Sequence, residues 1–260
     1  MSDTHGRFIW YELMTPHPAA AKTFYRQVVG WQAQDMPVGD SPPYTVFDVG
    51  GAGVGGMMPL GEEHKAAGVP PNWTAYVCVD DVGASAKQVD QLGGSVMRPP
   101  QDIPGIGRFA IVADPAGAVI AIMTPVPPEQ PRPQLPPGAE GGPAWHELYG
   151  ADPARGFDFY GALFGWTKAE AHDMGPMGIY QLFNTPDGQV GGMMRKPDHI
   201  PQPVWVYYFQ VGDIEAAADR VKAAGGQLRM GPMEVPSGAW VLQGVDPQGA
   251  AFALLGAKAA

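Results

Sequence analysis

The sequence predicts an α+β protein in which four β-α-β-β-β units pair into two bowl-shaped domains. Three observations lead to this prediction: an internal repeat that keeps its order, a proline-rich segment that divides the chain, and strand-like patterns that alternate with amphipathic helical ones. A length of 260 residues is sufficient for two domains of ordinary size, each with its own core.

The repeat covers most of the chain. Trp-Tyr-Glu-Leu at residues 10–13 returns as Trp-His-Glu-Leu at residues 145–148, and Val-Gly-Gly-Met-Met at residues 54–58 returns unchanged at residues 190–194. Later motifs recur in the same order, and their spacing drifts by only a few residues. We conclude that whole structural units were duplicated, so every functional interpretation applies to two copies.

A proline-rich segment separates the copies. Residues 125–143 contain eight prolines, which lack amide donors and favour an extended, semi-rigid path. This segment is therefore interpreted as a linker between a first domain at residues 1–124 and a second at residues 144–260.

In the first half, each unit starts with a strand that is followed by a helix. The first strand alternates as a half-buried strand does, and the first helix places Ala21, Phe24, Tyr25 and Val28 on one face before Gly30 ends it. Helices are expected at residues 18–29 and 83–92, and strands at residues 8–14, 32–37, 44–49, 53–59, 73–79, 95–98, 107–113 and 118–124.

The second half repeats this order and has a clearer first helix. Asp152 can cap its N-terminus, Pro153 suits the first helical position, and Gly165 supplies the stop. A β-α-β-β-β unit covers one sheet face with its helix, so two units side by side can curl their bare faces into a bowl. Further on, a helix is expected at residues 214–224 and strands at residues 204–211, 227–230, 239–244 and 250–255.

Composition narrows the class of protein. The formal net charge is −10, and an acidic surface repels phosphate backbones, so nucleic-acid binding is not expected. Cys78 is the single cysteine, which excludes an internal disulfide and fits a reducing compartment. No stretch approaches 18 apolar residues, and the first residues lack an apolar signal core. We therefore expect a cytoplasmic protein without membrane association.

Each half contains Phe-Tyr followed by Gly-Trp (Phe24 to Trp31 and Phe159 to Trp166), a helix that ends in Gly-Gly, and an Asp-Pro-x-Gly turn. In this order, and repeated twice, the motifs resemble those of the vicinal oxygen chelate superfamily, which includes glyoxalase I, bleomycin-resistance proteins and extradiol dioxygenases. The resemblance spans nearly all of both halves. It implies that both are glyoxalase/bleomycin-resistance-like domains.

Enzymes of this superfamily typically bind a divalent metal ion through His or Glu side chains from three strands. By the resemblance, these positions fall on Trp10, Thr74 and Ala121 in the first half and on Trp145, Val206 and Ala253 in the second. Tryptophan, valine and alanine side chains cannot bind a hard divalent ion, and threonine does so only weakly. We therefore expect neither a metal centre nor another cofactor.

Strand alternation predicts which side chains face each bowl. Both bowls are expected to be apolar and aromatic with one carboxylate, which suits a flat or aliphatic organic ligand held by stacking and dispersion. Arg108 and Trp240 are expected near the rims. The predicted ligand-binding residues are Trp10, Met14, Met57, Thr74, Tyr76 and Arg108 in the first half and Trp145, Tyr149, Met193, Tyr208, Gln210 and Trp240 in the second.

Glu12 and Glu147 are the candidate catalytic residues. Each can act as a general base or anchor an amine or hydroxyl of a ligand. Each can equally be a structural carboxylate that accepts a hydrogen bond from a nearby tyrosine, tryptophan or arginine. Duplication of a scaffold explains their recurrence as well as function does, so both interpretations stay open.

The sequence pattern favours structural roles for the other histidines, the cysteine and the glycine-rich segment. His146 corresponds to Tyr11 in the first half, and strand alternation predicts that it packs away from the bowl. Cys78 is expected to be a small buried apolar residue. The glycine-rich residues 50–56 lack a following Lys-Ser/Thr and predict a hairpin instead of a phosphate-binding loop. Surface positions are expected for His5, His17, His64, His172 and His199.

The sequence thus favours a protein that binds a small, largely apolar organic molecule in metal-free cavities. The alternative is an enzyme of lyase, isomerase or hydroxylase-like type that uses Glu12 or Glu147 as general base. A metal-dependent glyoxalase or dioxygenase is less compatible with the residues at the metal positions. Bowls plugged by Trp10 and Trp145, in a purely structural protein, are a further possibility. A small-molecule ligand is the expected partner, and the protein is expected to be a monomer or a homodimer.

Overall fold

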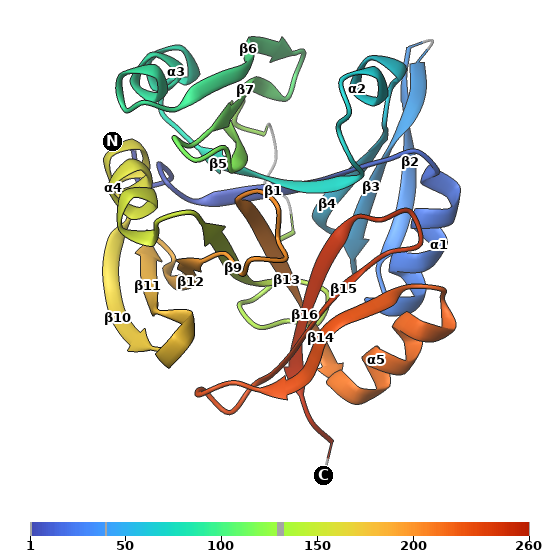
Figure 1. Cartoon of the computed structure of the whole chain (residues 1–260). Helices are drawn as coiled ribbons and strands as arrows, with labels where there is room; N and C mark the ends of the chain where they lie inside the picture. The colour runs from blue at the N-terminus through green and yellow to red at the C-terminus, as the bar shows by residue number, and fades with distance from the viewer. Residues whose placement is uncertain (1, 40, 129–132, 260) are drawn as a thin grey trace. The chain divides into compact units, whose positions relative to one another are not determined.

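Each half of the chain forms one eight-stranded mixed sheet in the computed structural model, which describes residues 2–39, 41–128 and 133–259 (Figure 1). Residues 129–132 of the predicted linker lie outside the described residues. The α+β class and the four β-α-β-β-β units are confirmed.

The first sheet has the strand order β2-β3-β4-β1-β5-β8-β7-β6. Its strands β1 and β4 pair in parallel, as do β5 and β8, whereas the hairpin partners are antiparallel. Its elements are β1 (Phe8–Thr15), α1 (Pro18–Val28), β2 (Gln32–Val38), β3 (Ser41–Val49), β4 (Ala52–Pro59), α2 (Glu62–Ala66), β5 (Asn72–Cys78), α3 (Val82–Gln91), β6 (Ser95–Ile103), β7 (Gly107–Ala113) and β8 (Val119–Pro125).

The second sheet repeats this topology, with the order β10-β11-β12-β9-β13-β16-β15-β14. Its elements are β9 (Pro143–Gly150), α4 (Pro153–Phe164), β10 (Thr167–Asp173), the short 3-10 helix η1 (Gly175–Met177), β11 (Ile179–Thr185), β12 (Gly188–Arg195), β13 (Val204–Asp213), α5 (Ile214–Ala223), β14 (Gln227–Glu234), β15 (Trp240–Val245) and β16 (Ala251–Ala257).

Compact packing does not follow the two halves of the sequence. The chain folds into two compact units, and each unit takes residues from both halves. Unit 1 comprises Met1–Ile9, Thr74–Gln130 and His146–Val206, and unit 2 comprises Trp10–Trp73, Pro131–Trp145 and Tyr207–Ala260. Helices α1 and α5 therefore pack together in unit 2, and α3 packs with α4 in unit 1 (Figure 1).

The helix ends follow the predicted signals. The carboxylate of Asp152 accepts hydrogen bonds from the amides of Ala154 and Arg155, and Pro153 is the first residue of α4. Gly165 closes the helix with a φ of 72°, a left-handed conformation that glycine adopts without steric cost. Within the described residues, no helix is long and apolar enough to span a membrane.

Two features of the fold differ from the predicted elements. The sequence does not predict α2 or η1, because five and three residues are too short to show helical periodicity. Strand β6 continues to Ile103 and strand β14 to Glu234, beyond the predicted ends at residues 98 and 230. Both are edge strands, where a proline such as Pro99 or Pro100, which lacks an amide donor, need not break a ladder.

A buried hydrogen-bonded network lies in the core of unit 2. The indole N–H of Trp73 donates to the hydroxyl of Tyr25 (2.8 Å), which in turn donates to Oδ2 of Asp246 (3.1 Å). The other carboxylate oxygen of Asp246 accepts hydrogen bonds from the backbone amides of Gln248 and Ala250. These bonds shape the Asp-Pro-x-Gly turn. Tyr25 comes from the first half and Asp246 from the second, so the turn holds the two halves together inside this unit.

Unit 1 contains the same network with the halves exchanged. The indole of Trp205 donates to the hydroxyl of Tyr160 (3.0 Å), and Tyr160 donates to Oδ2 of Asp114 (3.3 Å). The carboxylate of Asp114 also accepts hydrogen bonds from the backbone amides of Ala116 and Ala118. Three of the duplicated motifs thus serve to assemble the units.

Candidate functional site

Strand β1 carries the first candidate carboxylate. Its residues alternate between buried and partly exposed positions: Tyr11 and Leu13 are buried, whereas Trp10, Glu12 and Met14 are half-buried. Tyr11 contacts the aromatic rings of Tyr207 and Phe209 in the core of unit 2. Glu12 therefore lies on the opposite surface of the sheet (the helix-free face), as strand alternation predicts.

Tyr44 of β3 links Trp10 to Glu12. Its hydroxyl accepts a hydrogen bond from the Trp10 indole N–H (2.8 Å) and donates one to Oε2 of Glu12 (3.0 Å). Burial, and then the negative charge of Glu12, raise the pKa of Tyr44 far above its ordinary value, so the hydroxyl keeps its proton. The three side chains form one cluster in unit 2, in which the tyrosine fixes the carboxylate.

The position of Gly56 explains why the duplicated Val-Gly-Gly-Met-Met motif contains a second glycine. It pairs directly with Glu12 in the parallel ladder of β1 and β4. A Cβ atom at this position would collide with the hydroxyl and ring of Tyr44. Gly53 similarly leaves room for the Trp10 ring, which lies 3.3 Å from the position of a Cβ there. The glycines of β4 therefore make space for the aromatic side chains of the cluster.

Unit 1 contains the equivalent pair. The hydroxyl of Tyr180, on β11, lies 3.4 Å from Oε2 of Glu147, on β9. Gly192 pairs with Glu147, and a Cβ on Gly192 would collide with the Tyr180 ring. Glu147 is 8% exposed, so the second carboxylate is more enclosed than Glu12.

Sequence reasoning missed Tyr44 and Tyr180. They are separated by 136 residues, the same spacing that relates the two Gly-Gly-Met-Met segments, so the repeat contained the signal. The structure confirms that each glutamate bonds to a neighbouring tyrosine, which was one of the two interpretations left open. The role of general base stays a prediction.

Met57 and Met193 do not lie with the carboxylates. In the ladders, Met57 pairs with Leu13 and Met193 with Leu148, and all four side chains are fully buried. Adjacent residues of a strand point to opposite faces, so these methionines belong to the core. Register places Met58 beside Met14, and Met194 beside Tyr149, on the same face as the glutamates.

Arg108 and Trp240 also lie away from the other predicted ligand-binding residues. Arg108 forms an ion pair with Asp102 (3.0 Å) and lines an open depression of about 800 Å³ near the start of α3. Its neighbour Phe109 takes the helix-free face and lies 6.2 Å from the ring of Tyr76. The Trp240 ring is covered by the ammonium group of Lys258 at 4.6 Å. Strand alternation accounts for both differences.

Of the remaining predicted residues, Trp145 is half-buried on β9, and the others lie on β5 in unit 1 and on β13 in unit 2. Thr74 and Tyr76 are buried on β5. On β13, Tyr208 accepts a hydrogen bond from the side-chain amide of Gln243 (2.6 Å). The Gln210 amide bonds to the carbonyl of Val211 (3.1 Å). The structure therefore brings Trp10 together with Glu12. It also brings Tyr208 together with Gln243, a residue that was not predicted to bind ligand.

His146 packs inside unit 1, as predicted. Its ring stacks on Phe8 with the centroids 3.7 Å apart, and Nδ1 lies 2.8 Å from the carbonyl oxygen of Val190. Burial lowers the pKa of His146 to about 4, so the imidazole is neutral at pH 7. The prediction of a buried Cys78 is also confirmed, and burial raises the pKa of its thiol.

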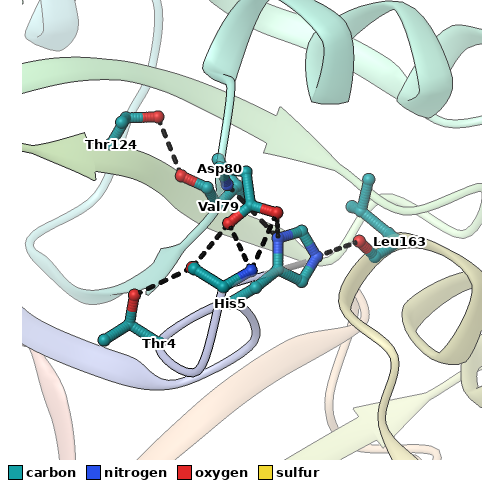
Figure 2. Close-up of polar contacts among 7 residues, drawn as sticks. Thr4, His5, Val79, Asp80, Thr124 and Leu163 are labelled. Carbon is teal, nitrogen blue, oxygen red and sulfur yellow. Dashed lines mark hydrogen bonds and ion pairs between the residues drawn. The ribbon is translucent and has the colours of Figure 1, made fainter.

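His5 is not a surface residue, contrary to the prediction. Its side chain is only 9% exposed, and Figure 2 shows it between Asp80 and Leu163. The amide of Asp80 lies 3.2 Å from Nδ1, and the carbonyl of Leu163 lies 3.2 Å from Nε2. A backbone amide can only donate, so Nδ1 is the acceptor and Nε2 carries the proton. His5 therefore fastens the N-terminal segment within unit 1.

The metal positions implied by the family resemblance do not suit a metal ion in this chain. Ala121 and Ala253 are fully buried and offer only methyl groups, and Trp10 uses its N–H as a donor to Tyr44. Across the ranges that the structure describes, no group of three or more His, Cys, Asp or Glu side chains is arranged to hold a metal ion.

Comparisons with known proteins agree with the fold. The sequence profile of the Glyoxalase/Bleomycin resistance protein/Dioxygenase superfamily matches residues 7–122 and 142–254. A Mycobacterium bovis protein named "Putative glyoxylase CFP32" is 33% identical over 252 residues, which cover 95% of this chain and 93% of that protein. The anthracycline biosynthesis protein DnrV of Streptomyces peucetius is 31% identical over 267 residues, 96% of this chain and 93% of that protein.

Solved structures show the same fold at low sequence identity. The Mn(II)-bound glyoxalase from Novosphingobium aromaticivorans superimposes with a TM-score of 0.63 at 17% identity, covering 97% of this chain and 82% of that one. A 2,2',3-trihydroxybiphenyl 1,2-dioxygenase from Sphingomonas wittichii superimposes with a TM-score of 0.67 at 14% identity, covering 97% and 90%. The profile match in both halves and the full-length relatives establish that this chain belongs to the glyoxalase/bleomycin resistance protein/dioxygenase superfamily.

Proposed function

We propose that this chain binds small, flat, largely apolar organic molecules without a metal ion, with Glu12 and Glu147 as the polar anchors. The observation that carries the proposal is the carboxylate–tyrosine pair that recurs in both halves on the helix-free face. A carboxylate held by a tyrosine is fixed in direction and can accept a hydrogen bond from a ligand hydroxyl or amine.

The surroundings of Glu12 support an aromatic ligand. The indole of Trp10 is half-buried, and its N–H is already committed to Tyr44, so the exposed part of the ring is apolar. Met14 lies on the same face and offers a polarizable thioether. An aromatic ring and a thioether beside one carboxylate suit a fused-ring ligand that carries a hydroxyl group.

The relatives point to the same class of ligand. DnrV of Streptomyces peucetius and DauV of Streptomyces sp. strain C5 are both named anthracycline biosynthesis proteins, and each aligns over 96% of this chain. Anthracyclines are fused-ring compounds that carry hydroxyl groups. We therefore choose a minimal probe of that chemistry, 2-naphthol, which has two fused aromatic rings and one hydroxyl.

Isothermal titration with 2-naphthol tests the proposal. We expect saturable binding to the wild-type chain, and binding at least about tenfold weaker in the double variant Glu12→Gln/Glu147→Gln, because the charge-assisted hydrogen bond is lost. Glu62→Gln, on the exposed helix α2, is the matched control and should bind as the wild type does. Absence of saturable binding to the wild type, or unchanged affinity in the double variant, would contradict the proposal.

Catalysis is the second candidate function, because Tyr44 and Tyr180 point their hydroxyl protons at the two glutamates. A glutamate oriented in this way can remove a proton from a bound substrate. Mass spectrometry and ¹H NMR of the probe after incubation separate the two functions, because an isomer keeps the mass of the probe. A chemical change that Glu12→Gln or Glu147→Gln abolishes would indicate an enzyme, whereas an unchanged probe that still binds indicates a binding protein.

A further inference from the structure

The two edge strands next to the carboxylate–tyrosine pairs carry different side chains at one equivalent position. In unit 1, His172 of the edge strand β10 pairs directly with Tyr180 of β11 (Figure 1). In unit 2, Met36 of the edge strand β2 pairs with Tyr44 of β3 in the same way. His172 and Met36 are separated by 136 residues, as Tyr180 and Tyr44 are, so the repeat and the strand register identify the same position.

His172 lies on the helix-free face, with the glutamate of unit 1. Side chains paired directly across neighbouring strands point to the same side of a sheet, so His172 shares the face of Tyr180. The ring of Tyr180 extends over β12, and its hydroxyl lies 3.4 Å from Oε2 of Glu147. Phe183, three residues along β11, points the other way and stacks on Trp166 in the core, with the ring centroids 4.6 Å apart.

The side chains around Glu147 come from a single compact unit. Glu147, Tyr180, Met194 and His172 all fall within residues 146–206. Strand β12 lies between β11 and β9, and it presents Met194 on the same face as Glu147. Neighbouring strands are about 4.8 Å apart, so β10 and β9 are separated by about 14 Å. Two side chains and a fused-ring ligand that rests over Met194 can bridge this distance.

Unit 2 has the same arrangement around Glu12, but its far end is apolar. Glu12, Tyr44, Met58 and Met36 all fall within residues 10–73, so this set also belongs to one compact unit. Met36 is 45% exposed, so a ligand on this face can contact its thioether. A thioether is only a weak hydrogen-bond acceptor and donates nothing.

His172 provides a hydrogen-bonding group at the equivalent end of unit 1. Its side chain is 40% exposed, and Nε2 lies 4.0 Å from Oε2 of Glu170, which is longer than a direct hydrogen bond. A neutral imidazole donates one hydrogen bond and accepts another. The ring can therefore replace the water that a ligand hydroxyl loses when the ligand binds.

We propose that His172 is a specificity-determining residue, which makes the site of unit 1 select fused-ring ligands with a second hydroxyl at the end opposite the Glu147 anchor. The site of unit 2, with Met36 at the equivalent position, selects ligands whose far end is apolar. This inference rests on the proposed function and assigns a ligand class to each of the two sites.

The physical reason is the desolvation of the second hydroxyl. A hydroxyl placed against Met36 loses its hydrogen bonds to water and gains only a weak acceptor, which costs free energy. A hydroxyl placed against His172 exchanges water for an imidazole, so the cost is repaid. An apolar ligand end has the opposite preference, because it gains from contact with the thioether and would cover the polar imidazole.

Isothermal titration with 2-naphthol and 2,6-dihydroxynaphthalene tests this inference. Glu12→Gln weakens the site of unit 2 and so reports on unit 1, and Glu147→Gln does the reverse. In Glu12→Gln, we expect the dihydroxy probe to bind about tenfold more tightly than 2-naphthol, the effect of one net hydrogen bond. In Glu147→Gln, no comparable gain is expected. Adding His172→Met to the first background should abolish the gain, and adding Met36→His to the second should create it.

The two reciprocal substitutions control for each other, because each introduces the residue that the other half already has. A preference gained by Met36→His cannot result from unfolding. Met97→His is the matched control: Met97 is 63% exposed on the edge strand β6, and the neighbouring strand β7 contains no tyrosine. This variant should leave the ratio of the two affinities unchanged.

The outcomes separate this inference from the proposed function. If the wild type binds 2-naphthol through the glutamates but neither His172→Met nor Met36→His changes the ratio of affinities, this inference is wrong while the proposed function stands. If the wild type binds neither probe, both are wrong.

Discussion

The two compact units share one buried hydrogen-bonded network and differ at a partly exposed pair of equivalent residues. Unit 1 joins Tyr160 to Asp114, and unit 2 joins Tyr25 to Asp246, through the same chain of hydrogen bonds. On the helix-free face, by contrast, unit 2 has an amide at Gln243 where unit 1 has the aliphatic Ile111.

This difference between buried and partly exposed positions reflects how much stability a substitution costs at each. A buried polar group that loses its partner is penalised by its full desolvation free energy, so each member of the Tyr–Asp network constrains the others. A partly exposed side chain can exchange protein contacts for water, so its replacement costs little stability. The duplicated chain could therefore diverge at partly exposed positions while the buried networks stayed fixed.

The largest expected effect comes from the shared network. Asp246→Ala leaves the hydroxyl of Tyr25 and two turn amides without their acceptor, and should lower the free energy of unfolding by about 3 kcal/mol. Asp114→Ala should cost a similar amount in unit 1. Denaturant titration measures both, with Asp213→Ala, a half-buried helix cap, as a control that loses about 1 kcal/mol. Clearly unequal losses at Asp114 and Asp246 would show that the units do not share this core.

Acid should reveal a difference between the units. His146 in unit 1 has a folded-state pKa of about 4, below the ordinary value near 6.5, whereas its counterpart in unit 2 is Tyr11. The neutral imidazole is favoured by folding, so its contribution is fully present above pH 6.5 and is lost as the pH falls towards 4. Protonation should cost about 3 kcal/mol across this window.

The matched variant for this prediction is His146→Tyr, which introduces the residue of the other half. It should remove the fall in unfolding free energy between pH 6.5 and 4, measured by denaturant titration at several pH values. An equally steep fall in the variant would assign the acid sensitivity to other groups.

The glycines beside the glutamates should be equally sensitive in both units. Gly56→Ala and Gly192→Ala each force a tyrosine ring out of its place, which should cost about 1–3 kcal/mol and weaken binding of 2-naphthol. Gly156→Ala, within α4, is the control: its Cβ would meet Leu148 at an ordinary 3.4 Å, and it should gain up to about 1 kcal/mol in helix stability. Thermal unfolding of all three variants provides the measurement, and an unperturbed Gly56→Ala would be incompatible with the observed tyrosine position.

The smallest expected difference concerns the tyrosine hydroxyls. Tyr44 bonds to Glu12 at 3.0 Å and also accepts from Trp10, whereas Tyr180 lies 3.4 Å from Glu147. Tyr44→Phe should therefore cost about 1.5 kcal/mol and Tyr180→Phe about 0.5 kcal/mol. A double-mutant cycle with Glu12→Gln should give a coupling energy near the first value, and a coupling near zero would exclude the bond in solution.

The repeat predicted the elements more securely than the contacts. Asp152, Pro153 and Gly165 fix the ends of α4 through local geometry, and the structure matches the prediction. Strand alternation correctly separated Glu12 from Leu13, because the period of two is a property of the strand itself. Met57 and Met193 were predicted to bind ligand, but their pairing with Leu13 and Leu148 places them in the core. Tyr44 was recoverable from the repeat, but only the fold shows that its hydroxyl reaches Glu12.

The sequence by itself determined the duplicated architecture, the order of the elements other than α2 and η1, and the presence of Ala121 and Ala253 at positions to which the family resemblance assigns metal ligands. These depend on local periodicity and on side-chain chemistry, which a single chain displays directly. Only the tertiary structure decided which half supplies the partner of each buried group, since Tyr25 and Asp246 are 221 residues apart. It also decided that Gln243 meets Tyr208, because hydrogen bonds between distant strands depend on register and packing, which no local pattern encodes.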